Sequence, residues 1–276
     1  MKNYFRLLWN HPTPIRFVTA RLLMVTGGCR WWTIRQDGFR LRFVPSNAAM
    51  SLWMNPGVRK GDHAFFRAWS KAGDWCVDVG ANIGEVALAL AVAVGPKGRV
   101  MAVEPHPRTC GWLRENIALN GLEHVTVVQV GVGEKAGVMR LTDSRRDDMN
   151  HVTDGEGVDV EVKRLDELVK EWNQLDLLKV DVEGYELPVL RGGAAVMSRV
   201  RCVVVEICQD NFRRFGYETG DLLEWIRGSG FSLFRSLEPG RLKSVPIDYL
   251  PQGFENVIGV RDVAELKART GWEVVG

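Results

Sequence analysis

The fold is decided by the stretch Asp78-Val79-Gly80-Ala81-Asn82-Ile83-Gly84, which lies within residues 75–104. An apolar run leads into this stretch, and a helix-length run of valine, alanine and leucine leaves it. The pattern predicts a strand, a tight turn and a helix. In an open α/β sheet such a turn lies at the carboxyl end of a central strand, where ligands bind. Gly80 and Gly84 lack Cβ, so the backbone can bend sharply and a ligand can lie against it.

A second predicted strand, residues 99–103, ends on Glu104-Pro105. A carboxylate at the tip of the strand after a glycine turn can accept hydrogen bonds from both hydroxyls of a ribose. The turn nevertheless lacks the dinucleotide fingerprint, because Asn82 and Glu85 occupy positions where that pattern has glycine. A pyrophosphate therefore has no gap to lie in, whereas an asparagine side chain suits the carboxylate or amine of an amino acid. The sequence predicts an adenosine ligand with a methionine tail, S-adenosylmethionine.

The composition is that of an ordinary globular protein, with 276 residues of which 46% are apolar and 25% are charged. This length supplies enough core for one large domain and an appendage. The net charge of +2 argues neither for nor against nucleic acid, and we expect no nucleic-acid partner. No stretch approaches the roughly 18 apolar residues that span a bilayer, so we expect no transmembrane segment and a cytoplasmic protein. The five cysteines form no CxxC pair and are expected to be reduced core residues: Cys29, Cys76, Cys110, Cys202 and Cys208.

Residues 1–30 combine basic and apolar side chains, and five of the ten tryptophans precede residue 70. We interpret this segment as a helical cap that packs on the main domain. The alternative is a segment that lies on a membrane surface or on a partner. An alternating strand over residues 38–44 and a short helix over residues 62–69 are predicted to follow.

Strands and helices alternate beyond residue 104, which favours a mostly parallel sheet with an antiparallel edge. Predicted helices cover residues 107–120, 165–172 and 221–228, and a further helix ends at residue 191. Predicted strands cover residues 125–130, 139–141, 158–162, 175–182, 200–207, 231–234 and 256–260. We expect 139–141 and 158–162 to pair as an antiparallel extension, with the polar residues 143–157 as a mobile loop near the mouth of the site. We divide the chain into a small N-terminal cap (1–70), a ligand-binding domain (71–262) and a C-terminal tail (263–276).

Four motifs together carry a resemblance to a known family. They are residues 78–84, Glu104-Pro105-His106-Pro107, Leu113-Arg114-Glu115-Asn116 with Leu119-Asn120-Gly121, and Lys179-Val180-Asp181-Val182-Glu183-Gly184. In this order and spacing they resemble the FkbM family of S-adenosylmethionine-dependent methyltransferases, from about residue 73 to residue 260. The closing Glu255-Asn256-Val257-Ile258 also looks like the last strand of that family. The resemblance implies a class I, Rossmann-like methyltransferase sheet in the strand order 3-2-1-4-5-7-6. It also implies O-methylation of a sugar, glycan or natural product, although some relatives methylate nitrogen.

The cofactor site is expected to consist of residues on the glycine turn and on the neighbouring strand ends. Asp78 is expected to approach the methionine amino group, or else to cap the following helix. Asn82 is expected to hold the methionine carboxylate, or else to serve as a turn residue. Gly131 is expected to offer its backbone to the adenine edge, although a turn explains this glycine nearly as well. The complete predicted set is Asp78, Gly80, Ala81, Asn82, Gly84, Glu104, Pro105 and Gly131.

The predicted catalytic residues are Lys179, Asp181 and Glu183. They alternate along the chain, so on one strand their side chains point the same way. Methyl transfer is an in-line displacement at a sulfonium, which requires a positioned acceptor and removal of its proton. Asp181 or Glu183 is the expected general base, and Lys179 would hold both in place. The alternative is a solvated, charged strand end.

Asp181 and Glu206 lie at neighbouring predicted strand ends and could instead share a divalent ion. We favour the absence of a metal, because no DxD-type cluster is present. His151 in the polar loop could act as a base, but a loop histidine is more often solvated. His106 is expected to help start the next helix.

Two other functions remain as alternatives. A nicotinamide-dependent oxidoreductase can share this sheet, but the missing GxGxxG motif argues against it. A non-catalytic binding protein would be favoured if the acids after residue 178 were dispensable. We expect a small-molecule or glycan acceptor, and we expect the region before residue 70 to form part of its pocket, because this region matches the family only loosely.

Overall fold

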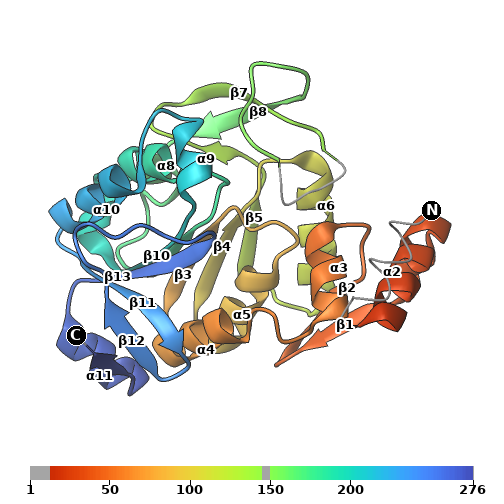
Figure 1. Cartoon of the computed structure of the whole chain (residues 1–276), viewed down its shortest axis with the longest axis horizontal. Coiled ribbons are helices and arrows are strands. Elements are labelled where there is room, and N and C mark those ends of the chain that lie inside the picture. The colour runs from red at the N-terminus through yellow and green to blue at the C-terminus, as the bar shows by residue number, and fades with distance from the viewer. Residues whose placement is uncertain (1–12, 145–149, 276) are drawn as a thin grey trace.

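The computed structural model describes residues 13–144 and 150–275, and a nine-stranded sheet runs through this part of the chain (Figure 1). Its centre is parallel, in the spatial order β5 (Val125–Val128), β4 (Arg99–Val103), β3 (Trp75–Val79), β9 (Leu175–Val180) and β10 (Val200–Ile207). The remaining strands follow in the order β13 (Glu255–Val260), β11 (Ser232–Glu238), β12 (Arg241–Ser244) and β14 (Glu273–Val275). β13 is antiparallel to both of its neighbours, β12 is antiparallel to β11, and the edge strand β14 is parallel to β12.

The strand order confirms the predicted fold class. With β12 and β14 set aside, the strands numbered along the chain lie in the order 3-2-1-4-5-7-6, as the family resemblance implies. The chain passes from β3 to one side through β4 and β5, and returns to the other side of β3 with β9. This reversal at β3 creates the crevice in which open α/β sheets bind their ligands.

Two layers of helices cover the sheet, because successive side chains of its strands point to opposite faces. Cys76 packs into one layer and Val77 into the other. The first layer contains α4 (Lys60–Trp69), α5 (Glu85–Val94), α6 (Pro107–Leu119) and α11 (Val263–Thr270). The second contains α7 (Leu165–Leu168), α8 (Glu186–Gly192), α9 (Gln209–Arg213) and α10 (Thr219–Gly228). All five cysteines are free and buried, as predicted.

The N-terminal region packs on the first helical layer. It contains α2 (Pro14–Thr26), the hairpin of β1 (Thr33–Gln36) and β2 (Phe39–Arg42), and α3 (Asn47–Met54). The predicted strand and helix before residue 70 correspond to β2 and α4. Asn116 ties this region to the glycine turn, because its side chain accepts from Arg42 N at 2.7 Å and donates to Ile83 O at 2.8 Å. The boundary at residue 70 stays a prediction. No helix among the described residues combines the length and apolar character needed to cross a membrane.

A second, three-stranded sheet holds β8 (Val158–Lys163) between β6 (Gly131–Val132) and β7 (Gly137–Leu141). β7 and β8 are antiparallel, as predicted. Residues 145–149 of the predicted mobile loop lie outside the described residues. The helix predicted for residues 165–172 ends at Leu168, and the chain then turns so that the Trp172 ring contacts the Trp75 ring at a centroid distance of 5.4 Å. The predicted tail contains α11 and β14, two elements that were not predicted from the sequence.

Candidate active site

A cavity of about 660 Å³ opens at the carboxyl ends of the central strands. It brings together residues that are far apart in the sequence but that the motifs single out. The predicted residues that line it are Asp78, Gly80, Ala81, Asn82, Glu104, Pro105, Gly131, Lys179, Asp181, Glu183 and Glu206, and both His106 and His151 do so as well. Gly84 is not among the lining residues, so its role is to shape the turn.

The glycine turn is held by contacts on both sides. The N–H groups of Gly80 and Ala81 both donate to Val103 O, at 2.9 and 3.0 Å, which fixes the turn to the end of β4. Gly80 has a φ of +84°, and a Cβ there would overlap the carbonyl oxygen of Asp181. Gly84 has a φ of +95°, and its Cβ would lie 2.6 Å from Leu113 Cδ1. Both positions therefore require glycine for packing as well as for backbone conformation.

Glu104 is buried at the tip of β4 and organises the surrounding backbone. Its Oε2 accepts from Asn82 N at 3.0 Å, and its Oε1 accepts from His106 N at 2.9 Å. These bonds orient the carboxylate toward the cavity that it lines. Each carboxylate oxygen can accept more than one hydrogen bond, so this geometry suits a ribose diol. His106 lies at the N-cap position of α6, as expected for a helix start.

Two buried oxygen atoms within residues 78–84 have no hydrogen-bond partner among the described residues. They are Asp78 Oδ2 and Asn82 Oδ1. Burial raises the pKa of Asp78 to about 6, although Lys179 partly offsets this effect. Asp78 also accepts a hydrogen bond from the backbone of Ala87, so helix capping and ligand binding are compatible. Buried acceptors without donors are costly, and the amino group of S-adenosylmethionine would supply donors. The turn therefore fits this cofactor.

A buried lysine and three carboxylates form the opposite side of the cavity. Lys179 Nζ donates to Asp181 Oδ2 at 2.7 Å, and only 2% of the lysine side chain is exposed. Burial alone would lower the pKa of Lys179, but the charges of Asp181 and Asp78 outweigh it and raise the pKa. Burial alone would raise the pKa of Asp181, but Lys179 and Arg59 outweigh it and lower the pKa. Asp181 is therefore ionised beside a lysine cation.

Glu206, at the end of β10, behaves differently from Asp181. Burial and the neighbouring Asp181 carboxylate raise the pKa of Glu206 to about 9. At neutral pH one carboxyl of this pair therefore carries a proton while the other is ionised, as in other buried carboxyl pairs. Asn256 lies opposite Glu206 in the β10–β13 ladder and also lines the cavity.

Glu183 reaches the same place by a different route from the one predicted. β9 ends at Val180, and Glu183 lies in the following turn with a φ of +55°. The expectation that Lys179, Asp181 and Glu183 alternate on one strand is therefore wrong for Glu183. The turn forms because Glu186 Oε1 accepts from Val182 N at 2.9 Å and from Gly184 N at 3.2 Å.

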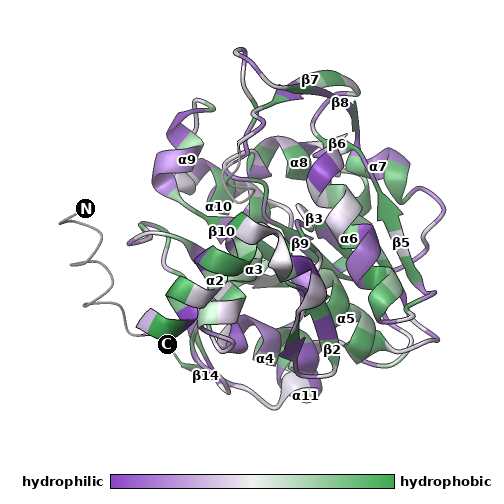
Figure 2. Cartoon of the chain, turned by 90° about the vertical axis from the view of Figure 1, so that its right-hand side faces the viewer, coloured by the Kyte–Doolittle hydropathy of each residue, from purple (hydrophilic) through white to green (hydrophobic). Residues whose placement is uncertain are grey.

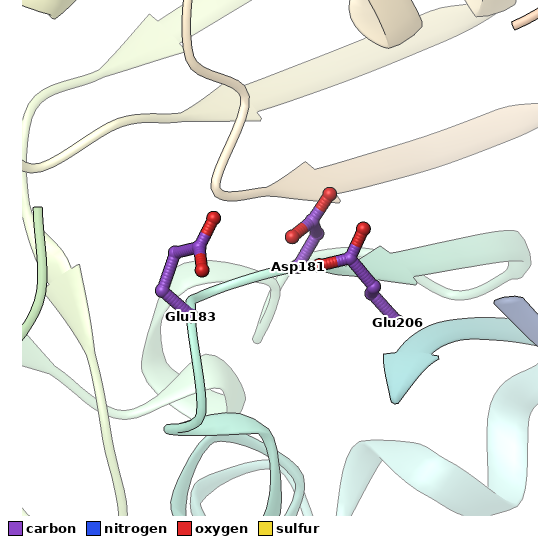
Figure 3. Close-up of side chains that lie close together, drawn as sticks. All are labelled: Asp181, Glu183 and Glu206. Carbon is purple, nitrogen blue, oxygen red and sulfur yellow. The ribbon is translucent and has the colours of Figure 1, made fainter. Parts of the chain in front are cut away.

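The carboxylates of Asp181, Glu183 and Glu206 point into one space (Figure 3). One oxygen from each lies within 4.8 Å of the others, a spacing that could hold a cation. The predicted metal alternative named only two of these acids. Lys179 already contacts Asp181, and Asn211 Nδ2 donates to Glu183 Oε2 at 3.1 Å. Glu206 shares a hydrogen bond with Asp181, so all three acids have protein partners.

Arg59 and Glu85 line the cavity but were not predicted as site residues. Arg59 Nε lies 3.3 Å from Glu85 Oε2, and His63 Nε2 lies 3.3 Å from Glu85 Oε1. Burial raises the pKa of Glu85 to about 7, although Arg59 partly offsets this effect. Glu85 could have been predicted as a site residue, because it is an acid directly after the glycine turn. Nothing in the sequence indicated Arg59 as a site residue, because it lies outside every motif.

Comparisons with known proteins agree with this geometry. The profile of the family described as "Methyltransferase FkbM domain" matches residues 78–233. The chain is 32% identical to "Methyltransferase sdnD" of Sordaria araneosa, over 52% of this chain and 70% of that protein. It is 26% identical to "2-O-methyltransferase NoeI" of Sinorhizobium fredii, over 47% and 61% of the two chains. It is 34% identical to "Hexuronic acid methyltransferase AglP" of Haloferax volcanii, over 47% and 54%. The aligned regions thus span between about half and 70% of these relatives.

Proposed function

Because the chain belongs to the FkbM family of S-adenosylmethionine-dependent methyltransferases, we propose that it methylates a hydroxyl group of a sugar, glycan or natural product. One observation supports methyl transfer at this site most directly. The backbone of Gly80 is packed so closely on the carbonyl of Asp181 that a Cβ has no room. The turn that would hold the cofactor and the acids that would activate the acceptor are therefore direct neighbours. In-line displacement requires such proximity.

Each contact that the reaction requires can be assigned to a residue of the cavity. When bound, S-adenosylmethionine supplies an electrophilic methyl group. Glu104 would bind the ribose, and Asp78 would bind the methionine amine. Asp181 accepts the proton of the acceptor hydroxyl as the oxygen attacks. Lys179 positions Asp181 and keeps it ionised, because the two side chains are 2.7 Å apart in a buried site.

The acceptor would bind between the acids and the N-terminal region. α3 and α4 contribute one wall of the cavity, including Ser51 and Arg59, while Arg235 and Asn256 contribute another. Asn256 Oδ1 is buried and has no hydrogen-bond partner among the described residues, so it can accept from a hydroxyl of the acceptor. Several polar groups around one cavity suit a polyhydroxylated molecule. The printed names of two relatives, a 2-O-methyltransferase and a hexuronic acid methyltransferase, support a sugar-type acceptor.

A panel of acceptors tests this function. Purified protein with methyl-labelled S-adenosylmethionine is expected to label a mono- or oligosaccharide, and mass spectrometry should show one added CH₂. The linkage separates the alternatives, because a methyl ether resists mild base, a methyl ester of a uronic acid is hydrolysed, and an N-methyl amine keeps a titratable nitrogen. Ester or N-methyl products would overturn hydroxyl methylation. A nicotinamide nucleotide in the small molecules released from the denatured protein would overturn the enzyme class.

The wall formed by α3 can be tested separately from the cofactor site. We expect Ser51→Trp to raise the KM for the acceptor by about tenfold or more, because a large side chain occupies the pocket. Affinity for adenosylhomocysteine should stay unchanged in calorimetric titration. Ser198→Trp is the matched control, because Ser198 is exposed and is not among the residues that line the cavity. Equal KM values for the two variants would place the acceptor elsewhere.

A truncation before residue 71 is not a usable test of this wall. Phe65, Phe66 and Trp69 are buried in the core, and Trp69 Nε1 donates to Asp176 O at 3.0 Å. Removal of α4 would therefore expose the first helical layer. Point substitutions that face the cavity avoid this problem.

A further inference from the structure

The outer face of α2 is apolar and exposed. Four large side chains lie on it: Ile15, Val18, Leu22 and Val25, whose exposed fractions are 81, 47, 62 and 86%. Their spacing of three, four and three residues places them on one stripe of the helix. In Figure 1, α2 lies at the end of the molecule farthest from α11, and Figure 2 faces this end. We call these four side chains the α2 stripe.

Polar groups on this face are already satisfied within the helix. Thr19 Oγ1 donates to Ile15 O, and Thr26 Oγ1 donates to Leu22 O, both at 2.8 Å. Helical spacing puts Thr19 and Thr26 between the apolar side chains of the stripe. Their hydroxyls therefore need no water, and the face can leave water at little cost in lost hydrogen bonds.

Exposed apolar side chains concentrate in this part of the chain. Thirteen large hydrophobic residues are exposed among the described residues, and six of them lie between residues 15 and 32. Two of the six are Trp31 and Trp32, which follow α2 directly and are 89 and 51% exposed. Tryptophan is enriched where proteins meet the interface between lipid and water.

The charged residues of the segment that contains α2 have one sign up to residue 36, directly before Asp37. Residues 1–36 contain no aspartate or glutamate, and their six basic residues are Lys2, Arg6, Arg16, Arg21, Arg30 and Arg35. Of these, Arg16, Arg21, Arg30 and Arg35 belong to the described residues and are exposed. A basic surface with an apolar face and adjacent tryptophans matches the features of helices that lie in a membrane interface.

We propose that the α2 stripe docks on a membrane surface that contains anionic phospholipids. The helix would lie along the interface with its stripe among the acyl chain ends, while arginines other than Arg16, which faces α3, contact lipid phosphates. A second copy of the chain fits this surface poorly, because a symmetric pair would bring the arginines of both copies together. The proposal does not depend on methyl transfer.

Docking would also orient the cavity. α2 packs against α3, and Arg16 Nη1 donates to Trp53 O at 3.3 Å. α3 in turn contributes Ser51 and Leu52 to the cavity wall. The cavity wall proposed to contact the acceptor is therefore separated from the lipid surface by α2. An acceptor carried on a membrane would meet the site at this wall.

Vesicle flotation tests the proposal with the full chain. Vesicles of phosphatidylcholine with about one third phosphatidylserine are expected to carry the protein, whereas pure phosphatidylcholine vesicles bind at least about tenfold less. Binding to the mixed vesicles should fall as salt rises to about 0.5 M, because exposed charges are then screened. Equal recovery with both kinds of vesicle, or no binding to either, would overturn the proposal.

Matched variants assign the binding to the helix. Val25→Glu and Leu22→Glu are each expected to lower the partition coefficient by about tenfold or more, because they remove apolar area and add a negative charge. Ile247→Glu is the control, because Ile247 is 85% exposed and lies outside α2, between β12 and β13. An equal loss in the control would overturn the assignment. Sedimentation at several protein concentrations tests whether a second copy of the chain covers the α2 stripe instead. If the protein dimerises, Val25→Glu abolishes the dimer and no vesicles bind, the occupant is a second copy.

Discussion

Glu104→Gln is expected to weaken the binding of adenosylhomocysteine by about ten- to a hundredfold, because hydrogen bonds to a charged group contribute roughly 1.5–3 kcal/mol. The structure adds a second reason for a loss of affinity. Glu104 accepts from the backbone of both Asn82 and His106, and a glutamine amide offers only one acceptor oxygen. Its NH₂ group would face a backbone N–H and would disturb the turn. Calorimetric titration measures the change directly.

The control for this experiment is Glu123→Gln, which makes the same change of charge at an exposed position outside the cavity. It is expected to bind adenosylhomocysteine like the unchanged protein. Thermal unfolding of both variants shows whether the lost affinity reflects a lost fold. If Glu104→Gln binds as tightly as the control, Glu104 does not contact the ribose.

The strand, turn and helix around residues 78–84 could be predicted because their signals are local. Periodicity gives the element type, and glycine marks the turn. The structure adds a second physical reason for glycine at position 80 to the one expected. The sequence suggested space for a ligand, whereas the structure shows that Gly80 also makes room for the carbonyl of Asp181, about a hundred residues later in the chain. Such a contact depends on strand order and cannot be inferred from a local pattern.

The position of Glu183 shows how a correct site can follow from an incorrect local structure. Alternation placed its carboxylate beside Asp181 on a continuous strand. In the structure a turn bends the chain back, and the three acids still meet. Gly184 was a signal that the strand could end early, but the bonds from Val182 and Gly184 to Glu186 were not foreseeable from spacing.

The C-terminal elements were missed because they carry weak local signals. β12 is a four-residue strand with Leu242 as its one apolar residue, and β14 has only three residues. α11 is fixed by contacts to distant parts of the chain. Arg269 Nε donates to Trp69 O at 2.9 Å, and the same guanidinium pairs with Asp74. Those partners lie about two hundred residues earlier.

Asp181→Asn is expected to lower turnover by about a hundred- to ten-thousandfold while the affinity for adenosylhomocysteine stays within about twofold, because general base catalysis contributes this much. An amide cannot take the proton of the acceptor hydroxyl. Single-turnover methyl transfer at saturating cofactor measures the step. Glu183→Gln is the matched variant, since its carboxylate lies in the same cluster but not beside Lys179. If Glu183→Gln alone loses turnover, the base is Glu183.

A variant of the remaining acid, Glu206, distinguishes proton transfer from metal binding. If Glu206 holds a proton, as its pKa of about 9 indicates, Glu206→Gln mimics the protonated form. This variant should keep its turnover near pH 7, and a chelator should leave the unchanged protein active. If the three acids bind a divalent cation, both treatments should abolish turnover, and magnesium should restore the chelated protein. Should Asp181→Asn and Glu183→Gln each turn over normally without dependence on metal, positioning of the acceptor alone would drive the reaction. The acids beyond β9 would then have no role as a base.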